Sequence, residues 1–592
     1  MVGLRFSVRH VLNNRKRASL TDRRILILQV AVILGLAVAA SRLFVLQVMS
    51  HDFYAALASD QHGIFERLFP ERGTIYLRDP KSPDGRFPIA VNKSLTLIYA
   101  DDRLVENPAG AAKKLAPLLE MDEKELEAKL AGGSDPYVPL KKKVPDETVE
   151  LVRVLNLPGI AFAREQFRFY PEKGSAAHIT GFVGSTDTGD KVGRYGIEGY
   201  WNKDLAGEPG YLETERDPVG RWIGAADRNF RPAKDGIELT LTIDRNIQYV
   251  ACDKLRQAVA RHGATGGAVV IMDPKTGAVI AMCGMPDYDP NDFSAVTDMS
   301  DYNNPAIFYA YEPGSVFKPI TMAAAIDAGK VMPTTLYNDE GAVTIGEFTI
   351  RNSDEKANGW QTMTQVLEKS LNTGAIFAVR QLGSQAFLKY VRDFGFGQPA
   401  GVELDSEAPG NISSLEKKGD IWSATASFGQ GITVTPLQMA TAFSVLANGG
   451  KLMKPYLVAE ARQSDGTVTR TEPTVARQVI TKRAATLVGG MLVRVVENGH
   501  GKRAGVPGYY VAGKTGTAQI SRAGGQGYEK DAFIGSFVGF APVDDPVFVM
   551  AVKIDRPQDV LFAESSAAPL FGDIAAFLLQ YMQIPPDRPL PK

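Results

Sequence analysis

The sequence predicts a multidomain α+β protein with a single N-terminal transmembrane helix, and three observations support this fold class. The chain has 592 residues, more than one ordinary domain holds. Apolar residues make up 44% and charged residues 22% of it, which is typical of folded protein. A basic segment and one long apolar stretch come first. In the remaining chain, some segments have the alternating apolar residues of strands and others have the apolar spacing of helices.

The N-terminal segment decides the predicted compartment. Residues 1–24 carry seven Lys or Arg against one acid, Asp22, and form a basic tail. Residues 25–48 are mostly apolar and long enough for one membrane-spanning helix, from which Arg42 can extend outward. Because basic flanks stay in the cytoplasm, the remaining chain is expected outside. Two alternatives stay open: a cleaved signal peptide, since residues 37–39 (Ala-Val-Ala) resemble a processing site, and a cytosolic protein.

Net charge and cysteine content exclude several classes of function. The formal net charge is −1, so the chain as a whole has no attraction for nucleic acid. The two cysteines, Cys252 and Cys283, can pair, but the fold is not expected to depend on a disulfide. No group of Cys and His has metal-ligand spacing, and no glycine-rich phosphate loop follows a predicted strand. The sequence therefore predicts neither a metal nor another cofactor.

Residues 49–235 are predicted to form a mixed domain with many turns. The segment from Arg72 to Asp79 has the features of a strand that begins with an Arg–Asp ion pair, which is a structural element rather than a catalytic one. Glu198 is expected to pair with Arg168 or Arg164. Such a pair would hold this domain to the next one.

Residues 236–582 are predicted to form a second domain, and residues 583–592 a proline-rich tail without structure. Asp244 ends an alternating strand and is expected to cap the helix that follows. Further along, two apolar segments joined by an Asp-Pro turn have the pattern of a hairpin. The predicted strands span residues 238–244, 267–272, 277–282, 533–541 and 547–554, and a closing helix begins near residue 567.

Ser315 and Lys318 are the candidate nucleophile and base, because residues three apart face one side of a helix. A Pro-Gly turn precedes Ser315 and an apolar run follows, so Ser315 is expected in the first helical turn, where free N–H groups favour an oxyanion. A serine hydroxyl needs a neighbour that takes its proton, and Lys318 can do so only if burial or a second cation lowers its pKa. An isolated Ser-x-x-Lys pair is more often a capping serine beside a solvated lysine.

Two further clusters follow in a recognisable order. Ser370-Leu371-Asn372 comes at the end of a predicted helix over residues 364–371, and Lys514-Thr515-Gly516-Thr517 comes much later. Ser-x-x-Lys, Ser-x-Asn and Lys-Thr-Gly in this order form the signature of the penicillin-recognising serine enzymes. The chain therefore resembles a class B penicillin-binding protein. Its Tyr-Glu-Pro-Gly-Ser lead-in is similar to that of the septal, FtsI-type group, which includes sporulation-specific enzymes. Leu371 departs from the acidic residue of the general pattern.

The resemblance implies a fold and a setting. Residues 49–235 would form an N-terminal pedestal (dimerisation-type) domain, and residues 236–582 a β-lactamase-like transpeptidase domain, an antiparallel sheet flanked by helices. The resemblance also implies a single-pass protein of the bacterial cytoplasmic membrane with its catalytic domain on the periplasmic side. A SEDS-type septal glycosyltransferase and other division proteins of the membrane are the implied partners.

The resemblance and the chemistry of the side chains together give the motif residues roles. Ser315 attacks, Lys318 takes the proton, and Ser370 relays a proton to the leaving amine. Asn372 holds Lys318 and the substrate backbone, and Lys514 supplies a positive field that also lowers the pKa of Lys318. The hydroxyls of Thr515 and Thr517 bind a terminal carboxylate. Gly516 leaves space for the substrate beside the strand. The N–H groups of Ser315 and Thr517 form the oxyanion site.

The implied substrate is a peptidoglycan stem peptide ending in D-Ala-D-Ala, and β-lactams would acylate the same serine. The implied activity is D,D-transpeptidation through an acyl-serine in division septum synthesis. An elongation or sporulation transpeptidase, a β-lactamase, and a non-catalytic division scaffold or β-lactam sensor are the alternatives. The N-terminal domain argues against a β-lactamase, and the complete set of motif residues argues against a scaffold.

Overall fold

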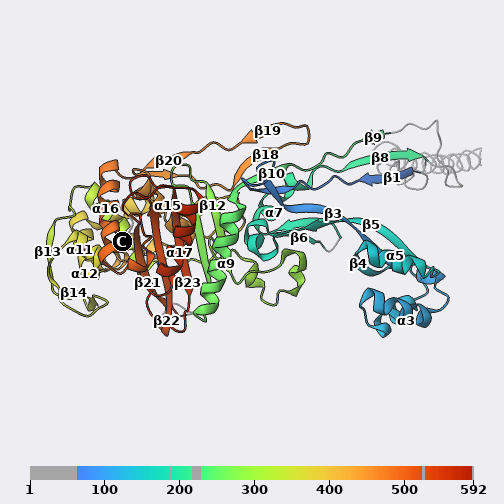
Figure 1. Ribbon diagram of the computed structural model, residues 1–592, viewed down its shortest axis with the longest axis horizontal. Helices are drawn as coiled ribbons and strands as arrows, with labels where there is room; N and C mark the ends of the chain where they lie inside the picture. The colour runs from blue at the N-terminus through green and yellow to red at the C-terminus, as the bar shows by residue number, and fades with distance from the viewer. Residues whose placement is uncertain (1–35, 37–62, 187–188, 216–228, 523–526, 590–592) are drawn as a thin grey trace, which may run out of the picture. The chain divides into compact units, whose positions relative to one another are not determined.

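The computed structural model describes residues 36, 63–186, 189–215, 229–522 and 527–589 (Figure 1). The predicted basic tail and membrane helix at residues 1–48, apart from Leu36, lie outside these residues. Within the described ranges, no helix combines the length and the apolar character needed to cross a bilayer. The chain divides into two compact units, one of residues 1–70 and 208–234 and one of residues 71–207 and 235–592.

The smaller unit contains a three-stranded antiparallel sheet in the order β1-β8-β9. Its strands are β1 (Gly63–Leu68), β8 (Gly210–Glu215) and β9 (Asn229–Arg231). Gly63 lies opposite Glu215 and Leu68 opposite Gly210. Two segments far apart in the sequence therefore form one ribbon.

A long mixed sheet in the larger unit has the order β19-β18-β10-β2-β3-β4, with β5 paired to β3. Its strands are β2 (Ile75–Arg78), β3 (Arg86–Ala100), β4 (Val138–Val144), β5 (Ile160–Phe169), β10 (Glu238–Asp244), β18 (Val458–Arg462) and β19 (Val468–Arg470). Strand β10 pairs in parallel with β2 and antiparallel with β18. The sheet therefore joins segments from both sides of the expected domain boundary at residue 235.

Three helices form a small separate core with β3 and β4. They are α3 (Pro108–Leu119), α4 (Glu123–Leu130) and α5 (Asp146–Val154). Leu115 and Leu119 on α3, and Leu126 and Leu130 on α4, recur four residues apart and are fully buried with Ile98 of β3. This spacing places each leucine pair on one face of its helix, so the polar faces remain in solvent.

The second large element is a five-stranded antiparallel sheet in the order β12-β11-β23-β22-β21. Its strands are β11 (Gly266–Met272), β12 (Val279–Met285), β21 (Ala512–Ser521), β22 (Tyr528–Ala541) and β23 (Phe548–Asp555). The predicted hairpin is confirmed, since Gly267 of β11 lies opposite Met285 of β12. Strand β21, which carries the Lys-Thr-Gly motif, is an edge strand.

Helices cover both faces of this sheet, which explains why its strands read as continuous apolar runs. Val269 and Ile271 of β11 belong to one core, and Val270 and Met272 belong to the other. The first core includes α9 (Arg245–Arg261) and α17 (Ala567–Tyr581), and the second includes α10 (Lys318–Asp327), α15 (Pro436–Ala447) and α16 (Lys482–Asn498). Asp244 caps α9 as predicted, because its carboxylate accepts the N–H groups of the first helical turn.

A disulfide joins Cys252 of α9 to Cys283 of β12. The sequence left this pairing open and predicted a fold that does not depend on it. Both cysteines are almost fully buried, and α9 packs directly on β12. The disulfide joins cysteines 31 positions apart and closes the chain between them into one loop, which restricts the unfolded chain.

Glu198 forms a buried ion cluster with two arginines. Its Oε1 lies 2.6 Å from Nε of Arg168, and its Oε2 lies 2.6 Å from Nε of Arg72. The Glu198 side chain is 0% exposed, the Arg168 side chain is 3% exposed and the Arg72 side chain is 11% exposed. The prediction of an Arg168–Glu198 pair is confirmed, but the prediction that it joins two domains is wrong, because all three residues lie between residues 71 and 207.

The predicted ion pair between Arg72 and Asp79 is also wrong. Arg72 forms an ion pair with Glu198, and Asp79 instead lies 3.3 Å from Nη1 of Arg245. The same guanidinium donates from Nε to Glu172 at 2.8 Å. Arg245 at the start of α9 is therefore one cation that ties the N-terminal segment to the segment after residue 235, and Arg86, which pairs with Glu238, is another.

Replacing Glu198 by Ala is expected to lower the free energy of unfolding by about 3–5 kcal/mol, because two nearly buried guanidinium groups lose their carboxylate. The matched control is Glu150→Ala. Glu150 pairs with Arg153 on α5, but both side chains are more than half exposed. Removing this pair is expected to change stability by about 0.5 kcal/mol or less. Urea denaturation followed by circular dichroism measures both variants, and equal effects would rule out a stabilising cluster at Glu198.

Candidate active site

Ser315 lies in a single 3-10 turn, η6 (Gly314–Phe317), which leads directly into α10. The predicted helical start is confirmed, with the tighter 3-10 geometry at the serine itself. Gly314 has a φ of +58°, and its N–H donates to the carbonyl of Gly429 at 3.0 Å, so the turn requires glycine. Pro319 lies at the second position of α10, where its missing N–H leaves no helical bond unmade.

Lys318 joins two of the three predicted clusters. Its Nζ donates to Ser315 Oγ at 3.0 Å, to Ser370 Oγ at 3.1 Å and to the carbonyl of Ser370 at 2.5 Å. The lysine is 1% exposed. Ser370 has a φ of +58°, a left-handed conformation that few residues other than glycine adopt. This strained backbone turns both the hydroxyl and the carbonyl of Ser370 toward one ammonium group.

Lys514 is the second buried lysine of the site, and it is 0% exposed. It lies on edge strand β21 as predicted, and its Nζ donates to the carbonyl of Thr515 at 3.0 Å. The strand is packed against the serine turn. A Cβ on Gly516 would lie only 2.8 Å from the carbonyl oxygen of Pro313.

Two predicted roles need correction. Gly516 was expected to leave space for the substrate, but the space where its side chain would be is filled by the Pro313 carbonyl and the Ser536 hydroxyl. Its lack of a side chain thus lets the serine turn approach β21. Asn372 was expected to hold Lys318, but its Nδ2 donates to the carbonyl of Arg351 at 2.9 Å.

The remaining motif residues lie along β21 beside the turn. Thr515 is 7% exposed, and its hydroxyl oxygen lies 3.3 Å from Lys514 Nζ. Thr517 is half-buried, and its hydroxyl accepts the N–H of Ala563 at 3.1 Å. Since that bond uses only a lone pair, the Thr517 hydroxyl keeps its proton free for donation to a ligand.

Both buried lysines have a lowered pKa, and the charge of Lys514 contributes to the shift of Lys318. Burial and the nearby Lys514 charge both hold the pKa of Lys318 well below its ordinary value. Burial lowers the pKa of Lys514 to about 7. Within the described part of the chain, neither ammonium group has a salt-bridge partner. A lysine with a lowered pKa holds its proton weakly, so Lys318 can be the unprotonated amine that a serine nucleophile needs.

The rate of acylation by labelled penicillin is expected to give a bell-shaped pH profile. As the pH falls through the lowered pKa of Lys318, the amine is protonated and the rate decreases. As the pH rises above the pKa of Lys514, the positive charge that attracts a carboxylate is lost and the rate decreases again. Stopped-flow labelling between about pH 5 and pH 9 tests this, and a flat profile would contradict the assignment.

Glu312 is a site residue that sequence reasoning did not identify. Its Oε1 accepts the N–H of Gly431 at 3.0 Å, and its Oε2 accepts the hydroxyl of Tyr528 at 3.1 Å. Burial raises the pKa of this carboxyl. Glu312 therefore ties the segment before Ser315 to a loop and to the start of β22. Its position in the Tyr-Glu-Pro-Gly-Ser lead-in was the available signal, but its partners are distant in sequence.

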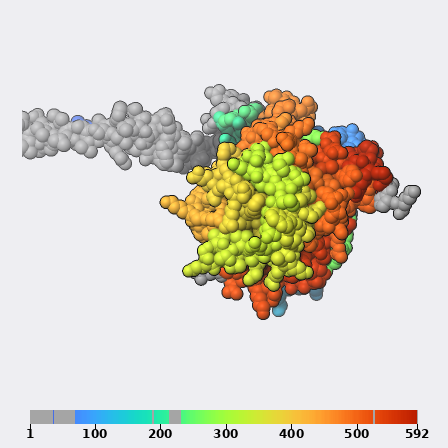
Figure 2. Space-filling model, turned by 90° about the vertical axis from the view of Figure 1, so that its left-hand side faces the viewer, coloured from blue at the N-terminus to red at the C-terminus, as the bar shows by residue number. Residues whose placement is uncertain are grey.

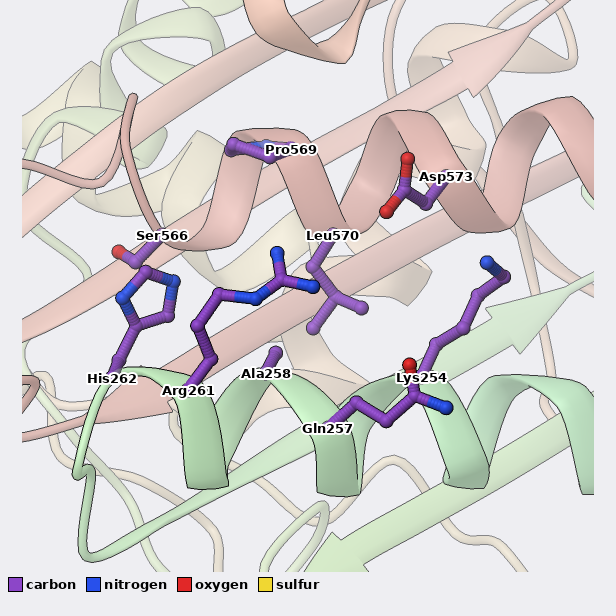
Figure 3. A pocket seen from close by; sticks show the side chains of 9 residues that line it. All are labelled: Lys254, Gln257, Ala258, Arg261, His262, Ser566, Pro569, Leu570 and Asp573. Atoms are coloured by element: carbon purple, nitrogen blue, oxygen red, sulfur yellow. The ribbon is translucent and has the colours of Figure 1, made fainter.

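A separate small pocket lies between α9 and α17, on the other face of the sheet from α10 (Figure 3). Lys254 and Arg261 of α9 and Asp573 of α17 line it, together with His262 and Ser566. The His262 ring lies 2.8 Å from Asp559, and the Ser566 hydroxyl has no hydrogen-bond partner among the residues that the structure describes. Within the described part of the chain, His262 and Ser566 therefore do not form a hydrogen-bonded pair. No cluster of His, Cys, Asp and Glu within the described residues could hold a metal ion.

The fold and this site define a penicillin-binding protein. A family model of the penicillin binding protein transpeptidase domain matches residues 267–576, and a model of the penicillin-binding protein dimerisation domain matches residues 67–241. The chain belongs to this family of transpeptidase-domain proteins.

Named relatives extend over almost the whole chain. Stage V sporulation protein D of Bacillus subtilis is 33% identical over 573 residues, which cover 96% of this chain and 87% of the relative. Peptidoglycan D,D-transpeptidase FtsI of Escherichia coli is 30% identical over 581 residues, which cover 97% and 94%. The crystal structure of penicillin binding protein 3 from Mycobacterium tuberculosis with aztreonam is similar with a TM-score of 0.68 and 26% identity, covering 89% of this chain and 99% of that one.

Proposed function

We propose that the protein is a peptidoglycan D,D-transpeptidase that works through an acyl-serine at Ser315. The observation that carries this proposal is the buried Nζ of Lys318, which lies 3.0 Å from Ser315 Oγ and 3.1 Å from Ser370 Oγ. The name of the Escherichia coli relative and the β-lactam complexes of the Mycobacterium tuberculosis protein support it.

Acylation requires that Ser315 lose a proton and that the leaving amine gain one. Lys318 takes the hydroxyl proton while Ser315 Oγ attacks the carbonyl carbon of the penultimate D-Ala. The N–H groups of Ser315 and Thr517 stabilise the oxyanion. The C–N bond to the last D-Ala then breaks, and Ser370 passes the proton from Lys318 to the departing nitrogen. Free D-Ala and an ester on Ser315 result.

In the second step, the acyl group is transferred from Ser315 to an acceptor amine, and the protons move in the reverse direction. An amine of a neighbouring stem peptide attacks the ester carbonyl, and the amine proton passes through Ser370 to Lys318. The C–O bond to Ser315 breaks, its oxygen regains the proton, and a new peptide bond forms. Lys514, with the hydroxyls of Thr515 and Thr517, would hold the terminal carboxylate of the donor peptide or of a β-lactam. Asn372 would contact the substrate backbone.

The setting belongs to the same proposal. Residues 1–24 would form a cytoplasmic tail, residues 25–48 the membrane anchor, residues 49–235 the pedestal, residues 236–582 the transpeptidase domain and residues 583–592 a tail. A SEDS-type glycosyltransferase would supply nascent glycan. Septum synthesis is favoured by the FtsI relative, and a sporulation role is favoured by the relative named Stage V sporulation protein D. Localising a tagged copy in dividing and in sporulating cells separates the two roles.

Labelling and product analysis of the full-length protein test the activity. The protein is incubated with fluorescent penicillin, digested and mapped by mass spectrometry. It is then given a stem pentapeptide donor and an amine acceptor. We expect the label on the peptide that contains Ser315, and one D-Ala released for each cross-link formed. Rapid release of hydrolysed penicillin would indicate a β-lactamase instead, and absence of both label and product would indicate a scaffold.

A further inference from the structure

Asp339 is a fully buried carboxylate at the end of strand β13 (Leu336–Asp339), and it is 1% exposed. Its Oδ1 accepts the Thr373 hydroxyl at 2.7 Å, Asn352 Nδ2 at 2.9 Å and the N–H of Gly341 at 3.1 Å. Its Oδ2 accepts Asn358 Nδ2 at 2.8 Å, Asn352 Nδ2 at 2.9 Å and the N–H of Asn358 at 3.1 Å. Each of these partners is uncharged, so the buried charge is compensated by hydrogen bonds from neutral groups.

The elements around Asp339 surround the Ser370-Leu371-Asn372 motif. Strand β13 pairs with β16 (Gly359–Thr362), and β14 (Ala342–Ile345) pairs with β15 (Phe348–Arg351). β13 and β14 lie at the left edge of Figure 1, on the face that Figure 2 turns toward the viewer. The motif leads into α12 (Asn372–Leu382), which packs against β13 and β15.

The network is attached to the residue that follows the motif. Thr373 donates its hydroxyl to Asp339, and its backbone N–H donates to Asn352 Oδ1 at 3.2 Å. One residue earlier, Asn372 Nδ2 donates to the carbonyl of Arg351. Both residues that follow Leu371 are thus held by the loop that contains Asp339 and Asn352.

Two local features make this attachment necessary. Ser370 has a left-handed backbone with a φ of +58°, a strained conformation that persists only where the surroundings fix it. Leu371 is the N-cap of α12 and has no side-chain oxygen to accept the first helical N–H groups. Asn352 accepts one of these N–H groups, and the negative charge of Asp339 lies near the positive end of the helix dipole.

The negative charge of Asp339 matters in addition to the shape of its side chain. Burial by itself raises the pKa of Asp339, but hydrogen bonds from Thr373, Asn358, Gly341 and Asn352 bring the pKa below its ordinary value. The ionised form is therefore the one that the network binds. An ionised acceptor makes stronger hydrogen bonds than a neutral one, so it fixes the position of Thr373 more firmly than an amide would.

We propose that Asp339 is a positioning residue for acyl transfer: through Thr373 it fixes the turn from which Ser370 presents its hydroxyl and carbonyl to Lys318. The inference rests on the proposed function. If Thr373 shifts, the strained Ser370 relaxes, and the bonds of Lys318 to Ser370 lengthen. The acylation step then slows, while β-lactam binding at Lys514 and Thr515 is unaffected.

The test uses Thr373→Val, which keeps the shape of the side chain but removes its hydroxyl, and Thr373→Ser, which restores the hydroxyl. Asp339→Asn and the double variant Asp339→Asn/Thr373→Val complete a mutant cycle. Two controls are matched to the site. Besides Asp339, the Thr373 hydroxyl lies 3.1 Å from Asn352 Oδ1 and 3.3 Å from the Tyr337 hydroxyl. Tyr337→Phe removes the last of these partners, and Asp354→Asn changes an exposed carboxylate between β15 and β16.

Stopped-flow labelling of the full-length protein separates the acylation rate constant at saturating penicillin from the half-saturating concentration. We expect Thr373→Val and Asp339→Asn each to lower the rate constant about tenfold and to leave the half-saturating concentration unchanged. Thr373→Ser and both controls should match the wild type. The double variant should be no slower than Asp339→Asn, because both changes remove the same connection.

Three outcomes would overturn the inference: a wild-type rate constant in Thr373→Val, failure of Thr373→Ser to restore the rate, or additive losses in the double variant. A melting temperature for each variant identifies any loss that comes from unfolding. If Asp339→Asn does not fold, the comparison of Thr373→Val with Thr373→Ser still decides the result. Absence of labelling in the wild type would instead contradict the proposed function, so the two failures are distinguishable.

Discussion

Replacing Ser315 by Ala is expected to abolish covalent attachment of penicillin and release of D-Ala. The hydroxyl is the acceptor for Lys318 Nζ, and it lies in the turn that supplies one of the two N–H groups proposed for the oxyanion site. Without it the site can bind but cannot form an ester. Because alanine fits the turn and only one hydrogen bond is lost, the melting temperature should stay within about 2 °C of the wild type.

Ser370→Ala is the control for this result, because Ser370 is the other hydroxyl in contact with Lys318. This variant should still be labelled, at a lower rate, on the peptide that contains Ser315. Gel fluorescence and peptide mapping measure both variants. Label on Ser315→Ala would show that another nucleophile is used and would remove Ser315 from the mechanism.

Lys318→Met is expected to lower the acylation rate constant by about 10²- to 10⁴-fold, the usual contribution of a general base. Methionine has a similar length and fills the same buried space, but it accepts no proton from Ser315. The melting temperature should not fall. The variant removes a polar group that burial and Lys514 both disfavour as a cation.

Lys330→Met is the matched control, since Lys330 follows the same helix and is exposed. Its rate constant and melting temperature should equal those of the wild type. Stopped-flow labelling and thermal unfolding of the two variants measure both effects. A rate in Lys318→Met within about threefold of the wild type would show that a different group takes the proton.

Much of the five-stranded sheet could be predicted because the sequence patterns of its strands and turns are local. The hairpin of β11 and β12, the strands β22 and β23 and the Asp244 cap each depend on neighbours in sequence. The same holds for the start of the helix after Ser315. For these elements, apolar alternation and turn residues are enough to indicate where a strand or helix begins.

Predictions that required a choice of partner were less successful. Arg72 was assigned to Asp79, seven residues away, but it pairs with Glu198. Charged groups select partners by distance in space, and the sequence offers several candidates of equal chemistry. The disulfide of Cys252 and Cys283 was left open for the same reason, since only the packing of α9 on β12 brings these sulfurs together.

The sequence by itself determined the chemistry: a serine, two lysines and a second hydroxyl in three ordered motifs, with the serine at a helix start. The tertiary structure alone decided how deeply these side chains are buried and which residues hold them in place. Burial, the larger cause, and the charge of Lys514 both lower the pKa of Lys318; the motifs predicted the contribution of Lys514, and only the structure shows that the lysine is buried. Asp339, Glu312 and the filled space at Gly516 were likewise invisible, because each role comes from contacts between segments distant in the chain.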